Sequence, residues 1–542
     1  MAPPLVTIEV VLALLVALAL LGEVSRSTSL PVPMVMIAGG VAIGLVPGLE
    51  RIHLDPDVFF LLFIPPLLYS DGWLMPKREF RDAMRPVLLL AFGLVFATVV
   101  AVGYAMHALI PALPLAAAFA LGAIVSPTDA VATAAMTARL PMPPRVNAIL
   151  GGESLINDAS GLVAFKFAVA AVATGTFSIV SAGGELAWLA GGGLAVGFAC
   201  AWLIGALRVG LKRVCVDDPT IQTILSLLSP FAAYLAAEGL GVSGILSVVA
   251  AGLYGGWHDA RYLSPATRQH AWEVWAMLLF VFNGLVFLLL GVTLPGAIAS
   301  LAKTEPPAML ALYAAVLWLV VNVVRLAWVY PGTWLPVLLS RRVRASEPPR
   351  DARAVFLVGW AGLRGSVTMA AALSVPVATA AGAAFPGRDL VIFLAGTTII
   401  STLLVNGLTL PWLVGRLGVR DDGAHERERR AAEAAIAGAA AQALERELAT
   451  LPPGDDASLG ARLVADYRAR AARHAAGADA RDEADRAETL HRRLAAVAIE
   501  AERRELFAML DAGLINDETR RAIETRIDHA EFVATGAARE IG

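Results

Sequence analysis

Long apolar segments follow one another through most of this chain, and they limit the folds open to it. An α-helix needs about 20 apolar residues to cross a bilayer, and on that criterion we predict about 13 transmembrane helices. Their approximate extents are Leu5–Leu21, Val32–Val46, Val58–Tyr69, Pro86–Ile110, Leu113–Met136, Leu150–Ala173, Leu186–Val209, Thr220–Ala237, Val242–Trp257, Glu273–Val292, Ala308–Leu338, Ala352–Ala381 and Leu390–Leu417. The composition agrees, because 57% of the 542 residues are hydrophobic and only 16% are charged. A soluble domain has about 25% charged residues, so we predict an all-α polytopic membrane protein.

The positions of the basic residues orient these helices. Basic clusters follow the third, fifth, seventh, ninth and eleventh predicted helices: Lys77 to Arg85, Arg139 with Arg145, Arg208 to Arg213, Arg261 with Arg268, and Arg341 to Arg353. The intervening loops contain almost no basic residues. Because basic loops stay in the cytoplasm, we predict an N-terminus outside the cell and a cytoplasmic C-terminus. Arginine greatly outnumbers lysine, as is typical of GC-rich bacteria, so we expect a bacterial inner membrane.

The composition changes sharply after Leu417. Residues 420–542 are rich in Ala, Arg and Glu, and they contain no long apolar run. Helical periodicity appears in Ala431–Leu448 and in Ala484–Leu510, and the segment Leu510–Glu518 indicates a helix end followed by a new N-cap. We therefore divide the chain into a transmembrane domain, 1–419, and a cytoplasmic helical tail, 420–542. The tail is either self-associating or a solvated helical segment without a specific partner.

Two groups of three predicted helices share one pattern. The fourth to sixth and the eleventh to thirteenth helices each have a polar middle member that Gly or Pro interrupts. Matching interrupted segments in two halves indicate an inverted repeat with a binding site near the middle of the membrane. The predicted topology starts the two groups on opposite sides of the membrane, as inversion requires.

Polar residues lie at membrane depth in two neighbouring segments, Ser126 to Asp129 and Glu153 to Asp158. Charge at that depth costs at least a few kcal/mol and usually serves a function. Ser154 and Asp158 are four residues apart and therefore share one helix face. The segment Glu153 to Asp158 thus combines carboxylates with a hydroxyl and an amide on one helix.

Pro127 removes a backbone donor and interrupts its helix. Freed carbonyls and the Thr128 hydroxyl then become available beside Asp129. Carboxylate and hydroxyl oxygens are hard ligands that suit Na⁺ or Li⁺. We predict that Asp158, Ser154 and Thr128 coordinate a transported Na⁺. The alternative is that these polar groups only bind one another between helices.

Two arginines in the second group are the expected charge partners. Arg325 and Arg364 both lie within apolar sequence, and a buried Arg keeps its charge and requires an anion. Our first choice is a pair of Glu153 with Arg325, which leaves Asp158 free for a cation or proton. Arg364 either pairs with Asp129 or holds the interrupted helix open through its carbonyls. Lys166, two turns beyond Asp158, is expected to extend toward a membrane interface, and a role in the proton cycle stays open.

These motifs resemble the cation:proton antiporter-1 family, the bacterial NhaP-like and animal NHE-like sodium/proton exchangers. The resemblance covers Leu5 to about Leu417 and rests on Ser126–Ala132, Gly152–Asp158 and Gly362–Gly365. It implies an inverted-repeat antiporter fold with two interrupted crossing helices, and a homodimer. It also implies that Asp158 carries the ion or the proton with Asn157 as its partner, and the Asn-Asp pair implies electroneutral one-for-one exchange. The other ion-site positions that it implies are Thr128, Asp129, Glu153 and Ser154, and the two core arginines are Arg325 and Arg364.

The resulting hypothesis is a monovalent cation/proton antiporter rather than an enzyme. Na⁺ and a proton compete for Asp158, and the protein exposes this residue alternately to each side. Transport runs on existing gradients, so we expect no cofactor, and the partners are cations, protons, lipid and a second copy of the chain. The sequence has no basic stripe with interleaved aromatic residues, so we do not expect nucleic-acid binding.

Three alternatives stay open at this point. The first is a K⁺/H⁺ exchanger of the same fold. The second is a cation channel, although deep charges of both signs fit a carrier better. The third is an intramembrane aspartyl protease, although the Tyr-Asp and Gly-x-Gly-Asp patterns of such a protease are absent around Asp129 and Asp158.

Overall fold

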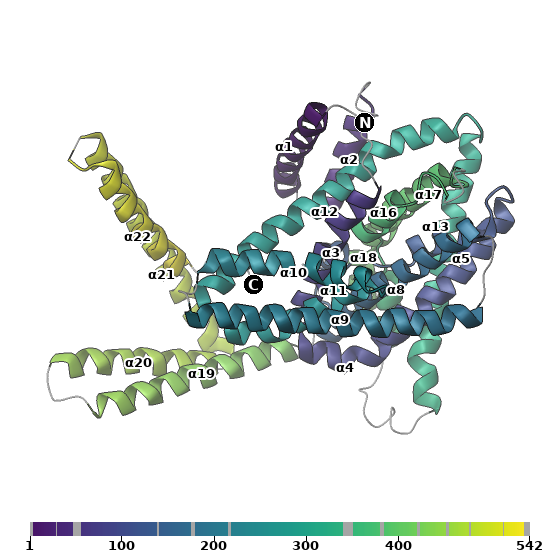
Figure 1. Ribbon diagram of the computed structural model, residues 1–542. Coiled ribbons are helices and arrows are strands. Elements are labelled where there is room, and N and C mark those ends of the chain that lie inside the picture. Colours follow the sequence, from purple (N-terminus) through teal and green to yellow (C-terminus); the bar gives the residue numbers. More distant parts are fainter. Residues whose placement is uncertain are drawn as a thin grey trace. The chain divides into compact units, whose positions relative to one another are not determined.

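The structure of the protein is a computed structural model (Figure 1). It describes residues 4–28, 30–46, 56–137, 140–174, 179–214, 218–339, 351–379, 384–419, 423–450, 455–475, 478–512 and 514–535. The regular elements within these ranges are helices. The chain forms two compact units, Met1–Asp421 and Asp422–Gly542.

The first unit contains two bundles that differ in which helices pack together. The first bundle consists of α1 (Pro4–Thr28), α2 (Val32–Gly44), α3 (Pro56–Leu74), α9 (Ile179–Val214), α10 (Pro219–Gly239), α11 (Gly244–Tyr262) and α12 (Pro265–Leu301). Its most extensive helix contact is that of α2 with α12, which lie next to each other in Figure 1. Glycines permit this approach, because a Cβ on Gly40 would lie 2.2 Å from the Leu288 carbonyl oxygen. Small residues have this role at many membrane helix interfaces.

The second bundle contains the two predicted groups of three helices. It consists of α4 (Lys77–Leu88), the π-helical turn η1 (Leu89–Leu94), α5 (Val95–Leu109), α6 (Leu115–Val125), α7 (Ala130–Thr137), α8 (Pro144–Thr174), α13 (Pro307–Leu339), α15 (Ala352–Trp360), α16 (Ser366–Leu373), α17 (Arg388–Ser401), the π-helical turn η2 (Thr402–Gly407) and α18 (Leu408–Leu417). The two predicted interruptions are present, between α6 and α7 and between α15 and α16.

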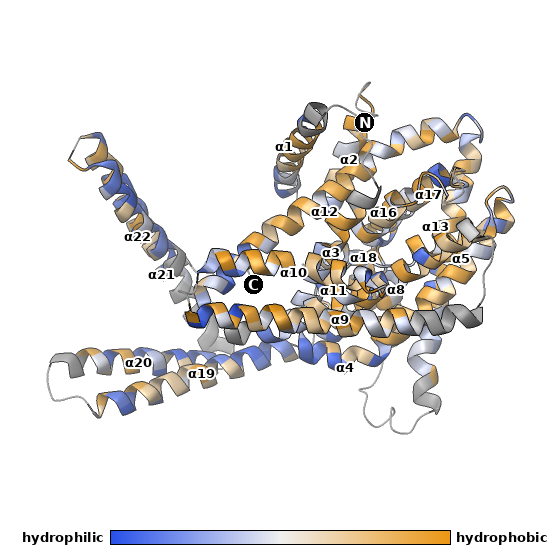
Figure 2. Cartoon of the chain, in the orientation of Figure 1, coloured by the Kyte–Doolittle hydropathy of each residue, from blue (hydrophilic) through white to orange (hydrophobic). Residues whose placement is uncertain are grey.

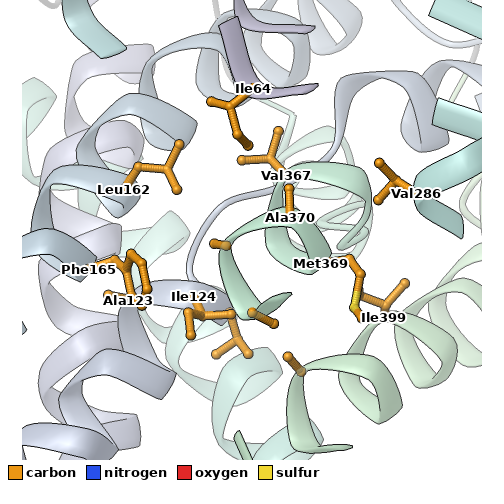
Figure 3. Close-up of a cluster of buried hydrophobic side chains, with 14 of the residues drawn as sticks. Ile64, Ala123, Ile124, Leu162, Phe165, Val286, Val367, Met369, Ala370 and Ile399 are labelled. Carbon is orange, nitrogen blue, oxygen red and sulfur yellow. The ribbon is translucent and has the colours of Figure 1, made fainter. Parts of the chain in front are cut away.

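The two bundles meet along an apolar core. α12 contacts α16 and α17, α3 contacts α16 and α8, and α11 contacts α8. Figure 3 shows part of this region, where Ile64 of α3 and Val286 of α12 lie around Val367 and Ala370 of α16. Leu162 of α8 belongs to the same buried cluster. The contact between the bundles is therefore made mainly by apolar side chains.

Eight helices within the described residues are long and apolar enough to cross a membrane, and the bent pair α6–α7 makes a ninth. Two shorter apolar helices, Val32–Gly44 and Phe60–Leu74, fall below that length. Helices buried in protein need not span the whole hydrocarbon layer, which is one reason that length alone counts fewer than 13. The exact number and the orientation stay predictions, and Arg139 and residues 340–350 of the basic clusters lie outside the described residues.

The second unit is two helical hairpins. α19 (Ala424–Leu448) pairs with α20 (Asp455–Ala475), and α21 (Ala478–Asp511) pairs with α22 (Asp517–Thr535). Figure 2 shows many hydrophilic residues on these helices, in contrast to the apolar helices of the first unit. The predicted N-cap is confirmed, because the Thr519 amide donates to Asn516 Oδ1 over 2.8 Å. α20 was absent from the sequence prediction.

Candidate functional site

Two helix interruptions lie against each other in the second bundle. α6 ends at Val125 and α7 begins at Ala130, with a bend of 41° between them. Pro127 lies in this gap, where its missing amide proton prevents a continuous helix. The second gap separates Trp360 from Ser366. The gaps touch directly, because the Asp129 amide donates to the Leu363 carbonyl over 2.8 Å.

Each interruption leaves backbone groups that need partners, because the ends of a helix have unsatisfied amides and carbonyls. Lipid supplies no such partners, so they must come from the protein. Arg364 Nη1 donates to the Ser126 carbonyl and, over 2.7 Å, to the Pro127 carbonyl. Of the two predicted roles for Arg364, the structure therefore has the contact with carbonyls of the interrupted helix.

The Asp129 carboxylate caps the N-termini of the helices that follow the two interruptions. Its Oδ1 accepts from the Ala132 amide over 2.7 Å, at the start of α7. Its Oδ2 accepts from the Ser366 amide over 2.7 Å and from the Ser366 hydroxyl over 3.2 Å, at the start of α16. A carboxylate is favourable at a helix N-terminus because the amides there carry partial positive charge. One side chain thus caps two helices of opposite halves.

Glu153 and Arg325 form the ion pair that the sequence suggested. Arg325 Nη1 contacts Glu153 Oε1, and Nη2 donates to Oε2 over 2.7 Å. Both side chains are 1% exposed. Arg325 also donates to the Gly359 and Val358 carbonyls, each over 3.0 Å, at the end of α15. The pair is therefore buried, bidentate and connected to the second interruption.

Hydroxyl and amide groups connect the first interruption to α8. The Ser154 hydroxyl donates to the Thr128 carbonyl over 2.6 Å, and Asn157 Nδ2 donates to the Thr128 hydroxyl over 2.8 Å. Longer contacts of 3.5 Å and 3.4 Å bring Thr128 and Asn157 to Glu153 Oε1. All the predicted oxygen-bearing residues thus lie within one connected region.

Asp158 differs from the other acids in its partners. Its side chain is 1% exposed, and its Oδ1 has no hydrogen-bond partner among the residues that the structure describes. The Oδ1 of the adjacent Asn157 is likewise buried and unpartnered within those residues. Buried polar atoms in proteins are almost always hydrogen-bonded. Two such oxygens on consecutive residues therefore mark a position where an external group can bind.

One acid near this site was not predicted from the sequence. Asp71 on α3 interacts electrostatically with both Asp158 and Asp129. The third predicted helix ended at Tyr69, two residues before Asp71, whereas α3 continues to Leu74. A charged residue two positions beyond the apolar run was the available signal. Asp71 belongs to the first bundle, so this acid approaches the site from the other side of the bundle interface.

Lys166 is engaged away from the site. Its Nζ lies 2.6 Å from Glu238 Oε1 at the end of α10. Glu238 Oε1 also accepts from the Gly244 amide over 3.3 Å, at the start of α11. Both charged side chains are more than a third exposed. Lys166 therefore connects α8 of the second bundle to the first bundle.

Comparison with known proteins identifies this arrangement. The transmembrane model of the sodium/hydrogen exchanger family matches residues 10–416. A sodium, potassium, lithium and rubidium/H⁺ antiporter of Bacillus pumilus is 41% identical over 416 residues, which cover 75% of this chain and 61% of that protein. The uncharacterised Na⁺/H⁺ exchanger YjcE of Escherichia coli is 36% identical over 540 residues, covering 96% of this chain and 97% of YjcE.

The fold has a solved counterpart. The sodium proton antiporter MjNhaP1 from Methanocaldococcus jannaschii matches with a TM-score of 0.57 at 19% identity, covering 76% of this chain and 99% of MjNhaP1. This likeness concerns the fold alone. The family match spans both bundles and both interruptions. The chain therefore belongs to the sodium/hydrogen exchanger family.

Proposed function

We propose that this protein is a secondary-active antiporter that exchanges a monovalent cation, foremost Na⁺, for protons across a bacterial inner membrane. The observation that carries the proposal is the different state of the three site acids. Glu153 is neutralised by Arg325, and Asp129 caps two helices. Asp158 alone keeps a buried oxygen without a partner among the described residues.

Exchange follows from competition at that carboxylate. Asp158 holds either a proton or a cation, because each supplies the positive charge that a buried carboxylate needs. The Asn157 Oδ1, the Ser154 hydroxyl and oxygens of Thr128 complete the ligands of the cation. Asp129 contributes negative charge near this position, whereas the charge of Glu153 is offset by Arg325. Hard oxygen ligands of this kind favour Na⁺ and similar cations.

An electroneutral stoichiometry of one cation for one proton belongs to the same proposal. Because Asp158 binds one unit of positive charge, a proton or a cation, in either loaded state, the second bundle has the same net charge in both directions of the cycle. The membrane voltage then does no work on the exchange. We further propose alternating access by movement of the second bundle against the first, in a homodimer.

Relatives favour a second candidate within the same class. The Bacillus pumilus protein is named for transport of potassium and rubidium as well as sodium and lithium. A relative from Bacillus subtilis, 39% identical over 412 residues, has the same name. We therefore propose K⁺ as the second candidate substrate, to be tested beside Na⁺. The matched segment is only 61% of each of these proteins.

The direct test uses purified protein in liposomes that contain a pH-sensitive dye. We expect an imposed Na⁺ gradient to drive proton flux in the wild type, with an unchanged rate when a membrane potential is imposed by the gradient of a permeant anion. Asp158→Asn should abolish flux while the protein remains folded and monodisperse. Flux that survives in Asp158→Asn would contradict the site, and current without a proton gradient would indicate a channel.

A further inference from the structure

A buried asparagine outside the ion site connects the last helical segment of the second bundle to α13 and to the end of α15, beside the second interruption. Asn406 lies in η2, a π-helical turn between α17 and α18. It is 1% exposed. π-Helical turns are rare and occur frequently at functional sites. The turn places the amide of Asn406 within the bundle, where lipid and water do not reach it.

The amide of Asn406 uses both its donors and its acceptor. Nδ2 donates to Asn322 Oδ1 over 2.6 Å and to the Trp360 carbonyl over 3.1 Å. Oδ1 accepts from Trp318 Nε1 over 3.2 Å. Asn322 Nδ2 donates in turn to the Trp318 carbonyl over 2.8 Å. Because an indole only donates and a carbonyl only accepts, this network permits one orientation of each amide.

The two acceptors of the Asn406 amide are the Trp360 carbonyl and Asn322 Oδ1, and both lie close to residues of the ion site. Trp360 is the last residue of α15, and its carbonyl is one of the unsatisfied groups at that helix end. Arg325 holds the two preceding carbonyls, those of Val358 and Gly359. Asn406 and Arg325 therefore share the task of fixing one helix end inside the membrane.

Asn322 provides the second connection. It lies three residues before Arg325 on α13, and residues at that spacing are neighbours on one helix face. Asn406 thus holds α13 beside α15 next to the Glu153–Arg325 pair. The segment after Trp360 contains Leu363, whose carbonyl receives the Asp129 amide. A displacement of the end of α15 would therefore reach Asp129 and Glu153 together.

We propose that Asn406 is a positioning residue of the ion site, which sets cation affinity by fixing the end of α15 and the adjacent Arg325. This inference rests on the proposed antiport function. Asn406 acts through the backbone of Trp360 and through α13 and touches no transported ion.

The test compares three variants in the liposome assay. Asn406→Ala removes all three hydrogen bonds. Asn406→Asp keeps the acceptor for Trp318 but places its second oxygen where Nδ2 faced the Trp360 carbonyl and Asn322 Oδ1. Thr409→Val is the matched control, because it removes a 2.9 Å bond from Trp360 Nε1 on the same stretch of helix and leaves the Trp360 carbonyl bonded. The readout is the Na⁺ concentration at half-maximal exchange, measured separately from the maximal rate.

A buried hydrogen bond contributes about 1 kcal/mol net. We therefore expect Asn406→Ala to raise the half-maximal Na⁺ concentration by about three- to tenfold, and Asn406→Asp by at least as much, because unpaired oxygens then face each other. Thr409→Val should keep the wild-type value. Asn322→Ala, which removes one of the three bonds, should give a smaller rise and serves as the milder variant if Asn406→Ala does not fold.

The outcomes separate the two proposals. A wild-type protein without Na⁺-driven proton flux would contradict the antiport function itself. A wild type that exchanges, with Asn406 and Asn322 variants that lose only maximal rate or folded protein at an unchanged half-maximal Na⁺ concentration, would give Asn406 a merely structural role. An equal rise in Thr409→Val would also overturn the inference.

Discussion

Three buried acids of the second bundle differ in their partners although they lie close together. Glu153 has a bidentate arginine, Asp129 has two helix N-termini, and Asp158 has an oxygen without a partner in the described part of the chain. A buried charge that is paired and hydrogen-bonded is stable, whereas an unpaired one binds a proton or another cation. The surroundings of each carboxylate, and not the residue type, therefore distinguish the acids.

The Glu153–Arg325 pair gives a prediction about stability. Arg325→Met leaves Glu153 buried without its partner, and loss of one member of a buried pair costs about 3–5 kcal/mol. The double variant Glu153→Gln/Arg325→Met removes both charges and should recover part of this loss. The measurement is the thermal unfolding midpoint of the purified protein in detergent.

Arg416→Met is the control for this comparison, because Arg416 is exposed at the end of α18. We expect its unfolding midpoint to stay close to that of the wild type. A double variant that is less stable than Arg325→Met alone would contradict the coupling of these two charges. It would then mean that Glu153 stabilises the fold even without Arg325.

The Glu153–Arg325 pair was predictable because a buried arginine requires an anion and few anions are at membrane depth. The partner of Arg364 was not, because the carbonyls freed by Pro127 and the Asp129 carboxylate are both suitable acceptors. Asp71 and Asn406 were missed for another reason. Their contacts join helices far apart in the chain, and no local spacing predicts which helices meet.

At the scale of elements, the two interruptions depend on close backbone contact at Gly365. A Cβ on this residue would lie 1.7 Å from Asp129 Oδ2. Gly365→Ala should therefore displace Asp129 from the start of α16. Overpacking costs about 1–3 kcal/mol and loss of a helix cap about 0.5–2 kcal/mol. We expect a lower unfolding midpoint together with a loss of exchange.

Gly415→Ala provides the matched control for Gly365→Ala. Gly415 lies in α18, and a Cβ there would meet no atom within 4 Å. Alanine also favours a helix over glycine, so this variant should be neutral or slightly more stable. If Gly365→Ala kept the wild-type midpoint and rate, the contact between Asp129 and α16 would not hold the interruption in place.

The N-terminal turn of α19 in the tail has its own charge network. Arg429 and Arg430 each contact Glu426 over 2.7 Å. The hydrogen bond from Arg429 is the main cause that lowers the pKa of Glu426 from 4.5 to about 2. A lowered carboxyl pKa means stabilisation that is present above about pH 4.5 and is lost as the pH falls toward 2. The pair is partly exposed, so its contribution is under about 1 kcal/mol.

Hydrogen exchange of the full-length protein tests this turn. At pH 7 the amides of the first turns of α19 should exchange faster in Glu426→Gln than in the wild type. The difference between the two proteins should shrink as the pH falls toward 2, because the wild-type carboxylate then becomes protonated. Glu447→Gln, in the last turn of α19, should leave these amides unchanged. A difference as large at pH 2 as at pH 7 would exclude the carboxylate as its cause.

Helices were predictable from the sequence where apolar segments were long and Pro or Gly residues marked their ends. Pro127 and the Gly-rich run before Ser366 indicated the interruptions, and both are present. The π-helical turns η1 and η2 carried no such signal. Their extra residue per turn is stabilised by tertiary hydrogen bonds, such as those of Asn406 and of Trp328 with the Leu89 carbonyl.

At the scale of the whole membrane unit, two bundles share an apolar interface with few polar links. Among the described residues these include the Lys166–Glu238 ion pair and a 3.2 Å bond from the Ser300 hydroxyl to Asp389. Surface ion pairs contribute about 0–1 kcal/mol. The weak polar links agree with the proposed movement of the second bundle against the first.

A cross-link between the bundles tests that movement. The side chains of Lys166 on α8 and Glu238 on α10 touch across the interface, so a short bifunctional maleimide reaches cysteines at both positions. Cys200 and Cys215 are first replaced by Ser. If the bundles must move for exchange, cross-linking Lys166→Cys/Glu238→Cys should abolish proton flux, whereas the unlinked variant should retain most of it.

The matched pair for the cross-link lies within the first bundle. Phe198 of α9 and Tyr254 of α11 have ring centroids 6.3 Å apart, so Phe198→Cys/Tyr254→Cys accepts the same reagent without joining the two bundles. We expect this link to leave flux nearly unchanged. A cleavable reagent adds reversibility, because reduction should restore flux in the Lys166/Glu238 pair. Full exchange in protein quantitatively cross-linked between the bundles would mean that the cation and the proton pass Asp158 without relative movement of the two bundles.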